Sequence, residues 1–189
     1  HLLQLVVKAS RSSANISGET GAGTEIVDAD ADTNMDSLIA SVFEAIQKLD
    51  ENDVPSNDRF MVVTPDIYYK LANVDKLVSR DFSANNGDFG KGSVVAIGGV
   101  PVIKSNTAVD SYVNSATDSA TGQNNDYLVN ASDVVATIFQ RGAIGTVKRK
   151  DLTLESTYDP RRMGTLMTAR MMVGHNILRP ECAVSINKS

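Results

Sequence analysis

The sequence predicts an α+β protein, in which helices, short strands and a hairpin alternate without the regular strand–helix–strand rhythm of a parallel sheet. Three observations predict this class. One long segment carries apolar residues at helical spacing, a pair of glycines separates two β-branched runs, and the last third of the chain is dominated by strand-like segments. The 189 residues are 42% hydrophobic and 22% charged, which is ordinary for a globular protein.

The first residues predict the end of a helix. Apolar residues recur at helical spacing within HLLQLVVKA, and the chain begins on His rather than Met. We therefore expect residues 1–9 to be the last turns of a helix whose beginning is missing. Residues 10–32 are rich in Ser, Gly, Thr and Asp, which predicts a loop with a short strand around residues 25–27.

The clearest element is an amphipathic helix over residues 34–50. Thr33 is expected to cap this helix, with Asp36 completing a capping box, and Pro55 enforces a stop after it. Its apolar residues recur three or four positions apart and so share one face, which comprises Met35, Leu38, Ile39, Val42, Phe43, Ile46 and Leu49.

The next segments predict a strand, a helix and a hairpin. Residues 59–63 (RFMVV) predict a short buried strand, after which Thr64 and Pro65 have the residue types that open a helix, ending by Val74. A second short segment, helical or a turn, is expected at residues 76–79, followed by a loop over residues 83–92. The hairpin joins 93–97 to 100–104, because Gly98-Gly99 supplies the two positive φ angles that a tight turn needs.

The last third is β-like. A polar loop over 105–126 precedes residues 133–140, which are predicted as a strand or a short helix. Two long strands are then expected at 146–157 and 165–173, and a closing strand at 183–186.

Tests for chemistry are mostly negative. One Cys and two His cannot form a disulfide within the chain or a typical zinc site, and no apolar run is long enough for a membrane helix. The Asp28-Asp30-Asp32 pattern lacks the Gly and Glu that a calcium loop requires. The segment 90–93 lacks the spacing of a phosphate loop. His175 and Cys182 are expected to be structural. No catalytic, cofactor-binding or metal-binding residue is predicted.

Charge is unevenly distributed along the chain. Residues 1–140 carry 9 Lys and Arg against 19 Asp and Glu, a balance of −10, whereas residues 141–189 carry 9 against 4, a balance of +5. Halves of opposite sign suit association between copies, because complementary fields steer partners and fix their register. A chance division of a solvated surface is the alternative. The sequence pI near 5.0 argues against wrapping of nucleic acid as the main activity.

The densest charged motif in a β context is YDPRR, residues 158–162. Two interpretations are open. It is a turn closed by a pair between Asp159 and an arginine, or it docks a neighbouring copy through the guanidinium groups of Arg161 and Arg162. The basic run 148–150 predicts a solvated strand edge, with weak contact to DNA phosphates as the alternative.

Three segments carry a family resemblance. They are LDENDVPSNDRFMVVTPDIYYKL (49–71), GKGSVVAIGGVPVIKSN (90–106) and STYDPRRMGTLMTARMMVGHNILRPECAVSI (156–186). In order and spacing they resemble the major capsid protein of short-tailed phages, of the podovirus type related to the autographiviruses. The pattern Y-D-x-R-R-x-G…G-H-x-x-L-R-P-E-A-A-V is the most specific part, and Cys182 stands here where Ala is commoner.

The resemblance implies the Hong-Kong-ninety-seven-type capsid fold. Residues 34–144 would form the axial domain, a mixed sheet flanked by helices. Residues 1–33, which start at the end of the spine helix, and residues 145–189 would belong to the peripheral domain with its long β strands. The family's N-terminal arm and extended loop would be missing from this sequence.

The resemblance also implies a function. The protein would be a non-enzymatic virion protein that assembles with itself into hexamers and pentamers of an icosahedral head around double-stranded DNA. It would be made in the bacterial cytoplasm, use no cofactor or membrane, and meet a scaffold protein, a portal at one vertex and, in some phages, cement proteins. Packaged DNA would be contacted only weakly. Asp159, Arg161 and Arg162 are the candidate subunit-interface residues. Two alternatives remain, a hydrolase-type domain using His175 and a monomeric binding module using the 105–126 loop.

Overall fold

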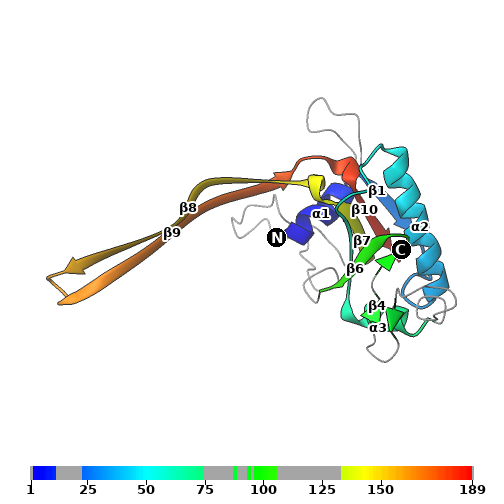
Figure 1. Ribbon diagram of the computed structural model, residues 1–189, viewed down its shortest axis with the longest axis horizontal. Helices are drawn as coiled ribbons and strands as arrows, with labels where there is room; N and C mark the ends of the chain where they lie inside the picture. Colours follow the sequence, from blue (N-terminus) through cyan, green and yellow to red (C-terminus); the bar gives the residue numbers. More distant parts are fainter. Residues whose placement is uncertain are drawn as a thin grey trace, which may run out of the picture. The chain divides into compact units, whose positions relative to one another are not determined.

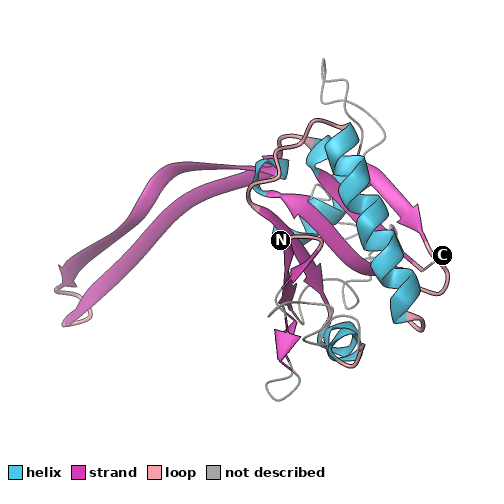
Figure 2. Ribbon diagram, turned by 45° about the vertical axis from the view of Figure 1, so that its right-hand side comes forward, coloured by secondary structure: helices cyan, strands magenta, loops and turns pink. Residues whose placement is uncertain are grey.

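A computed structural model describes residues 2–11, 23–74, 87–88, 93–94, 96–105 and 133–188. The chain divides into two compact units. One comprises His1–Ile144 and Ile177–Ser189 and contains a six-stranded sheet with helices (Figure 1). The other, Gly145–Asn176, is a two-stranded antiparallel hairpin, seen as the long pair of strands in Figure 2.

The six-stranded sheet is mixed. Its strand order is β1-β10-β7-β2-β6-β5, with β1 parallel to β10, β2 parallel to β6, and the other neighbours antiparallel. The strands of this sheet are β1 (Thr24–Val27), β2 (Arg59–Val63), β5 (Ala96–Ile97), β6 (Val100–Lys104), β7 (Val134–Gln140) and β10 (Ala183–Asn187).

The remaining elements complete the two units. Helix α2 (Met35–Glu51) packs on the sheet. The short 3-10 helices Arg141–Ala143, after β7, and Pro180–Cys182, before β10, contact each other. The other described elements are α1 (Leu2–Ser10), α3 (Pro65–Ala72), the paired two-residue strands β3 (Gly87–Asp88) and β4 (Ser93–Val94), and the hairpin strands β8 (Ile144–Asp159) and β9 (Gly164–Ile177).

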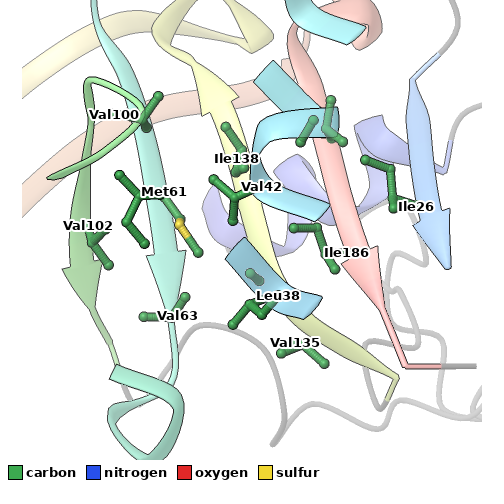
Figure 3. Close-up of a cluster of buried hydrophobic side chains, with 14 of the residues drawn as sticks. Ile26, Leu38, Val42, Met61, Val63, Val100, Val102, Val135, Ile138 and Ile186 are labelled. Carbon is green, nitrogen blue, oxygen red and sulfur yellow. The ribbon is translucent and has the colours of Figure 1, made fainter. Parts of the chain in front are cut away.

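The core lies between the sheet and α2. Figure 3 shows Leu38 and Val42 among strand side chains such as Met61 and Ile138, and all four are fully buried. Neighbouring residues of a strand point to opposite faces, so Val62 lies on the other face, where it packs with Val7 of α1. The sheet is therefore covered by α2 on one face and by α1 on the other.

The helix predicted over 34–50 is confirmed, with two corrections. Its cap is Asn34 rather than Thr33, because the Asn34 side-chain oxygen accepts hydrogen bonds from the backbone N–H groups of Asp36 and Ser37. Phe43 is 54% exposed, whereas the Ala45 side chain is fully buried. The buried stripe is therefore narrower than the apolar pattern suggested.

The strand at 59–63 and the helix opened by Pro65 are confirmed. The helix starts at Pro65 and ends at Ala72, although the Thr64 hydroxyl makes no capping hydrogen bond. The segment 133–140 was predicted as either a strand or a short helix, and its residues form the strand β7. The two long strands β8 and β9 extend beyond their predicted ends. The helical or turn segment expected at 76–79 and the loop at 106–126 lie outside the described residues. Within the loop predicted over 83–92, Gly87–Asp88 form a short strand, because they pair with Ser93–Val94.

The predicted glycine turn joins β5 to β6. Gly98 and Gly99 have φ angles of 57° and 81°, in the left-handed region. A Cβ atom at Gly98 would stand 2.6 Å from Ile46 Cδ1 and 3.2 Å from Phe43 Cε1, so the turn also packs closely on α2. A side chain at this position would meet both backbone strain and contact with α2.

Gly98→Ala is expected to lower the free energy of unfolding by about 1–2 kcal/mol, because a left-handed conformation costs about that much in an L-residue. Denaturant unfolding measures this change. The matched background is Ile46→Val, which removes the Cδ1 atom in the way of the new methyl group. The loss caused by Gly98→Ala should be smaller in that background, and an equal loss in both would contradict the packing of the turn on α2.

Candidate functional site

The β8–β9 hairpin exposes an unusual amount of apolar surface. Its two strands pair only with each other, so no third strand or helix of that unit covers either face. Large exposed apolar patches on soluble proteins mark interaction sites. The apolar side chains of this unit that are 52% to 84% exposed are Val147, Leu152, Leu154, Tyr158, Met163, Leu166, Met167, Met171 and Met172.

Two side-chain contacts show which residues share a face of the hairpin. An Arg170 guanidinium nitrogen lies 3.2 Å from a carboxylate oxygen of Glu155, and the Thr146 hydroxyl lies 2.9 Å from His175 Nδ1. Each contact joins an even-numbered to an odd-numbered residue, one pair toward each end of the hairpin. Since side chains alternate along a strand, even positions of β8 share a face with odd positions of β9.

The two faces differ in character. The face that holds Thr146 and His175 is named the apolar face, and its exposed large residues are Leu152, Leu154, Tyr158, Met167 and Met171. The opposite face is named the charged face. Its charged residues are Arg149, Asp151, Glu155, Asp159 and Arg170, and it also exposes Val147, Leu166 and Met172. The hairpin is thus amphipathic in that most of its charged side chains and all of its acids lie on one face, while large apolar side chains are exposed on both faces and more numerous on the other.

The tip of the hairpin holds the predicted interface residues. The Asp159 carboxylate accepts a hydrogen bond from the backbone N–H of Arg161 at 3.0 Å, and the Asp159 carbonyl accepts one from the N–H of Arg162 at 3.3 Å. Met163 follows with a φ of 50°. Asp159 therefore closes the turn through the backbone, and no ion pair of either guanidinium group occurs within the described part of the chain.

The other residues weighed for chemistry have structural surroundings. His175 contacts Thr146, as expected for a hydrogen-bonded structural histidine. Cys182 is fully buried in the core, and this burial raises the pKa of its thiol. Among the described residues, no three His, Cys, Asp or Glu side chains are grouped to hold a metal ion, and no helix is long and apolar enough to cross a membrane.

Asp28, the first of the spaced aspartates, is tied to α2. Its carboxylate accepts hydrogen bonds of 2.8 Å from the hydroxyls of Ser37 and Ser41 and one of 3.1 Å from the N–H of Asp30. Partial burial raises the pKa of Asp28, but these three hydrogen bonds together outweigh it and leave that pKa lowered. The aspartate acts as a fixed, ionised anchor for the loop before α2.

Arg59 is a residue whose role the sequence did not show. Its side chain is only 5% exposed, yet it sits at the start of the strand β2. Its guanidinium group donates to Asp50 at 2.7 Å, to the Pro55 carbonyl at 3.0 Å and to the Val54 carbonyl. The signal in the sequence was a lone arginine next to an apolar strand, which does not by itself specify a partner.

Comparison with known proteins identifies the family of this chain. The sequence model of the Gp10A-like major capsid proteins matches residues 1–187. The chain belongs to this family. It is 27% identical over 158 residues to the major capsid protein of Escherichia phage T7 and 30% identical over 162 residues to that of Enterobacteria phage T3. Each match covers 79% of this chain, but 46% and 45% of the relatives, so the chain spans about half their length.

Solved capsid structures agree with this family. The capsid structure of the cyanophage P-SCSP1u matches with a TM-score of 0.83 and 31% identity, over 98% of this chain and 59% of that chain. The mature capsid of bacteriophage PhiM1 matches with a TM-score of 0.75 at 20% identity, over 99% of this chain and 58% of that chain, which supports the fold alone. The predicted phage capsid fold and the predicted resemblance to podovirus-type major capsid proteins are confirmed. No relative or structure named here supports a hydrolase.

Proposed function

We propose that this chain is the shell-building part of a phage major capsid protein, which assembles with itself into hexamers and pentamers of an icosahedral head around double-stranded DNA. The observation that carries the proposal is the exposed, amphipathic β8–β9 hairpin in a member of a capsid family. Such a surface is unfavourable in water and is suited to be covered on assembly. The protein is made in the bacterial cytoplasm and resides in the phage head.

The proposed domain organisation follows the capsid fold. Residues 34–144 form the axial domain, and residues 1–33 and 145–189 form the peripheral domain. The separate unit Gly145–Asn176 supports the placement of the long strands outside the axial domain, whereas the strands β1 and β10 share the six-stranded sheet with strands of residues 34–144. The helix α1 supports the assignment of the first residues to the end of a spine helix.

The proposed partners are those of a structural subunit. Copies of the chain are the main partner, a scaffold protein acts during assembly, a portal occupies one vertex, and cement proteins are possible additions in some phages. Packaged DNA is contacted weakly and without sequence preference. No catalytic step is assigned, because the titratable groups described above hold structural hydrogen bonds.

Electron microscopy and light scattering of the full-length protein, with scaffold protein present, test this function. Shells of uniform size are expected. Persistent monomers would contradict the proposal and favour a binding module. A His175→Ala variant should still form shells and infectious particles, because the His175 contact with Thr146 is assigned a structural role in the proposal. If the variant particles assembled normally but were not infectious, that result would instead favour a catalytic role for His175.

Asp159, Arg161 and Arg162 are proposed as subunit-interface residues. Asp159 shapes the turn, and the turn presents two guanidinium groups that have no ion pair within the described residues. Guanidinium groups bind carboxylates through two parallel hydrogen bonds, which gives both strength and orientation. The acidic remainder of a neighbouring copy offers such carboxylates.

Arg161→Ala and Arg162→Ala are each expected to lower the yield of shells several-fold, while the melting temperature of the unassembled protein stays within about 1 °C, since an exposed arginine contributes little to folding. Light scattering and thermal unfolding measure the two effects. Arg141→Ala, at an exposed arginine outside the hairpin, is the matched control and should leave both unchanged. A lower melting temperature with normal assembly would make these arginines structural residues of their own chain.

A further inference from the structure

The apolar face of the hairpin is bordered by positive charge only. Lys148 and Lys150 occupy even positions of β8 and therefore lie on this face, beside Leu152. All three acids of the unit, Asp151, Glu155 and Asp159, occupy odd positions of β8 and lie on the charged face. Lys148 Nζ lies 2.7 Å from a carboxylate oxygen of Asp151, whereas Lys150 has no ion pair among the described residues.

The charges of the two units are complementary. The unit Gly145–Asn176 carries six Lys and Arg against three Asp and Glu, a net charge of +3. Since the whole chain has a net charge of −5, the other unit has a net charge of −8. The negative charge is concentrated in residues 28–58, which hold nine acids and one lysine. Of these acids, Glu44, Asp53 and Asp58 are exposed and make no ion pair within the described ranges.

Methionine is concentrated in the same hairpin. Four of the six methionines of the chain lie there, at exposures of 52% to 84%. The methionine side chain is unbranched and polarisable, so it adapts to partners of different shape. Met167 and Met171 lie on the apolar face, and Met172 lies on the charged face.

We infer that the apolar face of the hairpin, with Met167 and Met171 at its centre and Lys150 at its rim, is an interface for the acidic unit of a second copy of this chain. This inference rests on the proposed shell function and specifies which face makes the contact. The apolar centre provides the area buried in the interface. The basic rim selects the acidic partner, because like charges across an interface are strongly unfavourable. The adaptable methionines let one face fit neighbours whose arrangement differs between hexamers and pentamers.

Oxidative footprinting of the full-length protein tests the inference. A short pulse of hydrogen peroxide is applied to the unassembled protein and to shells, and methionine sulfoxide is measured peptide by peptide. Met167 and Met171 should oxidise about tenfold more slowly in shells than in the unassembled protein, because sulfoxide formation follows exposure. Met172, one residue from Met171 and on the opposite face, is the internal control and should change much less.

Any other result of the oxidation experiment would overturn either the inferred interface or the proposed function. Slow oxidation of Met167 and Met171 already in the unassembled protein would show that their own chain covers the face. Equal oxidation in shells and unassembled protein would show that assembly does not use it. Absence of shells from the unsubstituted protein would instead contradict the proposed function, so the two failures are distinguishable.

A pair of charge reversals tests the partner. Lys150→Glu is expected to raise the protein concentration needed for assembly by about tenfold, a ratio equivalent to about 1.4 kcal/mol. Arg149→Glu makes the same charge change at the preceding residue, on the opposite face, and should have a much smaller effect. The melting temperature of both unassembled variants should be unchanged, since both side chains are exposed. Equal effects of the two substitutions would overturn the assignment of the face.

Discussion

Replacing Arg59 by Ala is expected to lower the free energy of unfolding by about 3 kcal/mol, because loss of one member of a buried hydrogen-bonded charge pair costs about 3–5 kcal/mol. The lower end applies, since the Asp50 side chain is 62% exposed and can be solvated. The Val54 carbonyl, by contrast, would lose its donor in a buried position. For a chain of this size the melting temperature should fall by about 6–12 °C. Denaturant and thermal unfolding measure these changes.

Two conservative substitutions separate the contributions of Arg59. Arg59→Lys keeps the charge but cannot reach Asp50, Val54 and Pro55 together, because an ammonium group lacks the planar fork of a guanidinium. It should therefore retain only part of the stability. Asp50→Asn should cost less than about 1 kcal/mol, as expected for an exposed ion-pair partner. If Arg59→Ala were no worse than Asp50→Asn, the buried carbonyl contacts would have no energetic importance.

Local signals predicted the elements whose cause is local. The strand 59–63 and the glycine turn were predicted from short motifs, and both hold because an apolar β-branched run and two positive φ angles need no distant partner to be recognised. The cap of α2 moved from Thr33 to Asn34 because both residue types cap helices, and the local sequence does not decide between neighbours.

Tertiary contacts account for what the sequence left open. Residues 133–140 were ambiguous because the strand β7 is buried on both faces, and a continuous apolar run has no period that distinguishes strand from helix. Phe43 lies at the edge of the helical stripe, where it meets the Gly98 turn instead of the core. The partners of Arg59 come from a helix end and a loop, which no residue spacing reveals.

The candidate site shows the same limit. The motif 158–162 located the tip of the hairpin, but the partner of the Asp159 carboxylate proved to be a backbone N–H rather than a guanidinium group. The apolar face escaped notice because its residues come from two strands. Only the pairing of those strands brings Leu152, Leu154, Met167 and Met171 onto one side.

Gly23→Ala is expected to lower the free energy of unfolding by about 2–3 kcal/mol, in the upper part of the range for overpacking a close contact. A Cβ atom at this position would stand 2.0 Å from the Ala9 carbonyl oxygen and 2.6 Å from two backbone atoms of Ser10. Backbone atoms cannot rotate away as a side chain can. The end of α1 and the residue before β1 must therefore separate, and denaturant unfolding measures the cost.

The movement of α1 away from Gly23 should also be detectable in the hydrogen exchange of α1. Arg11 beyond this helix pairs with Glu25 of β1 at 2.8 Å, and Glu25 accepts a hydrogen bond from Asn187 of β10 at 2.9 Å. Because Gly23 lies between these groups in the chain, Gly23→Ala should loosen this connection and speed hydrogen exchange in α1 more than in α2. Gly174→Ala is the matched control, since a Cβ atom there meets nothing within 4 Å. Equal stability of the two variants would show that α1 does not pack on the Gly23 backbone.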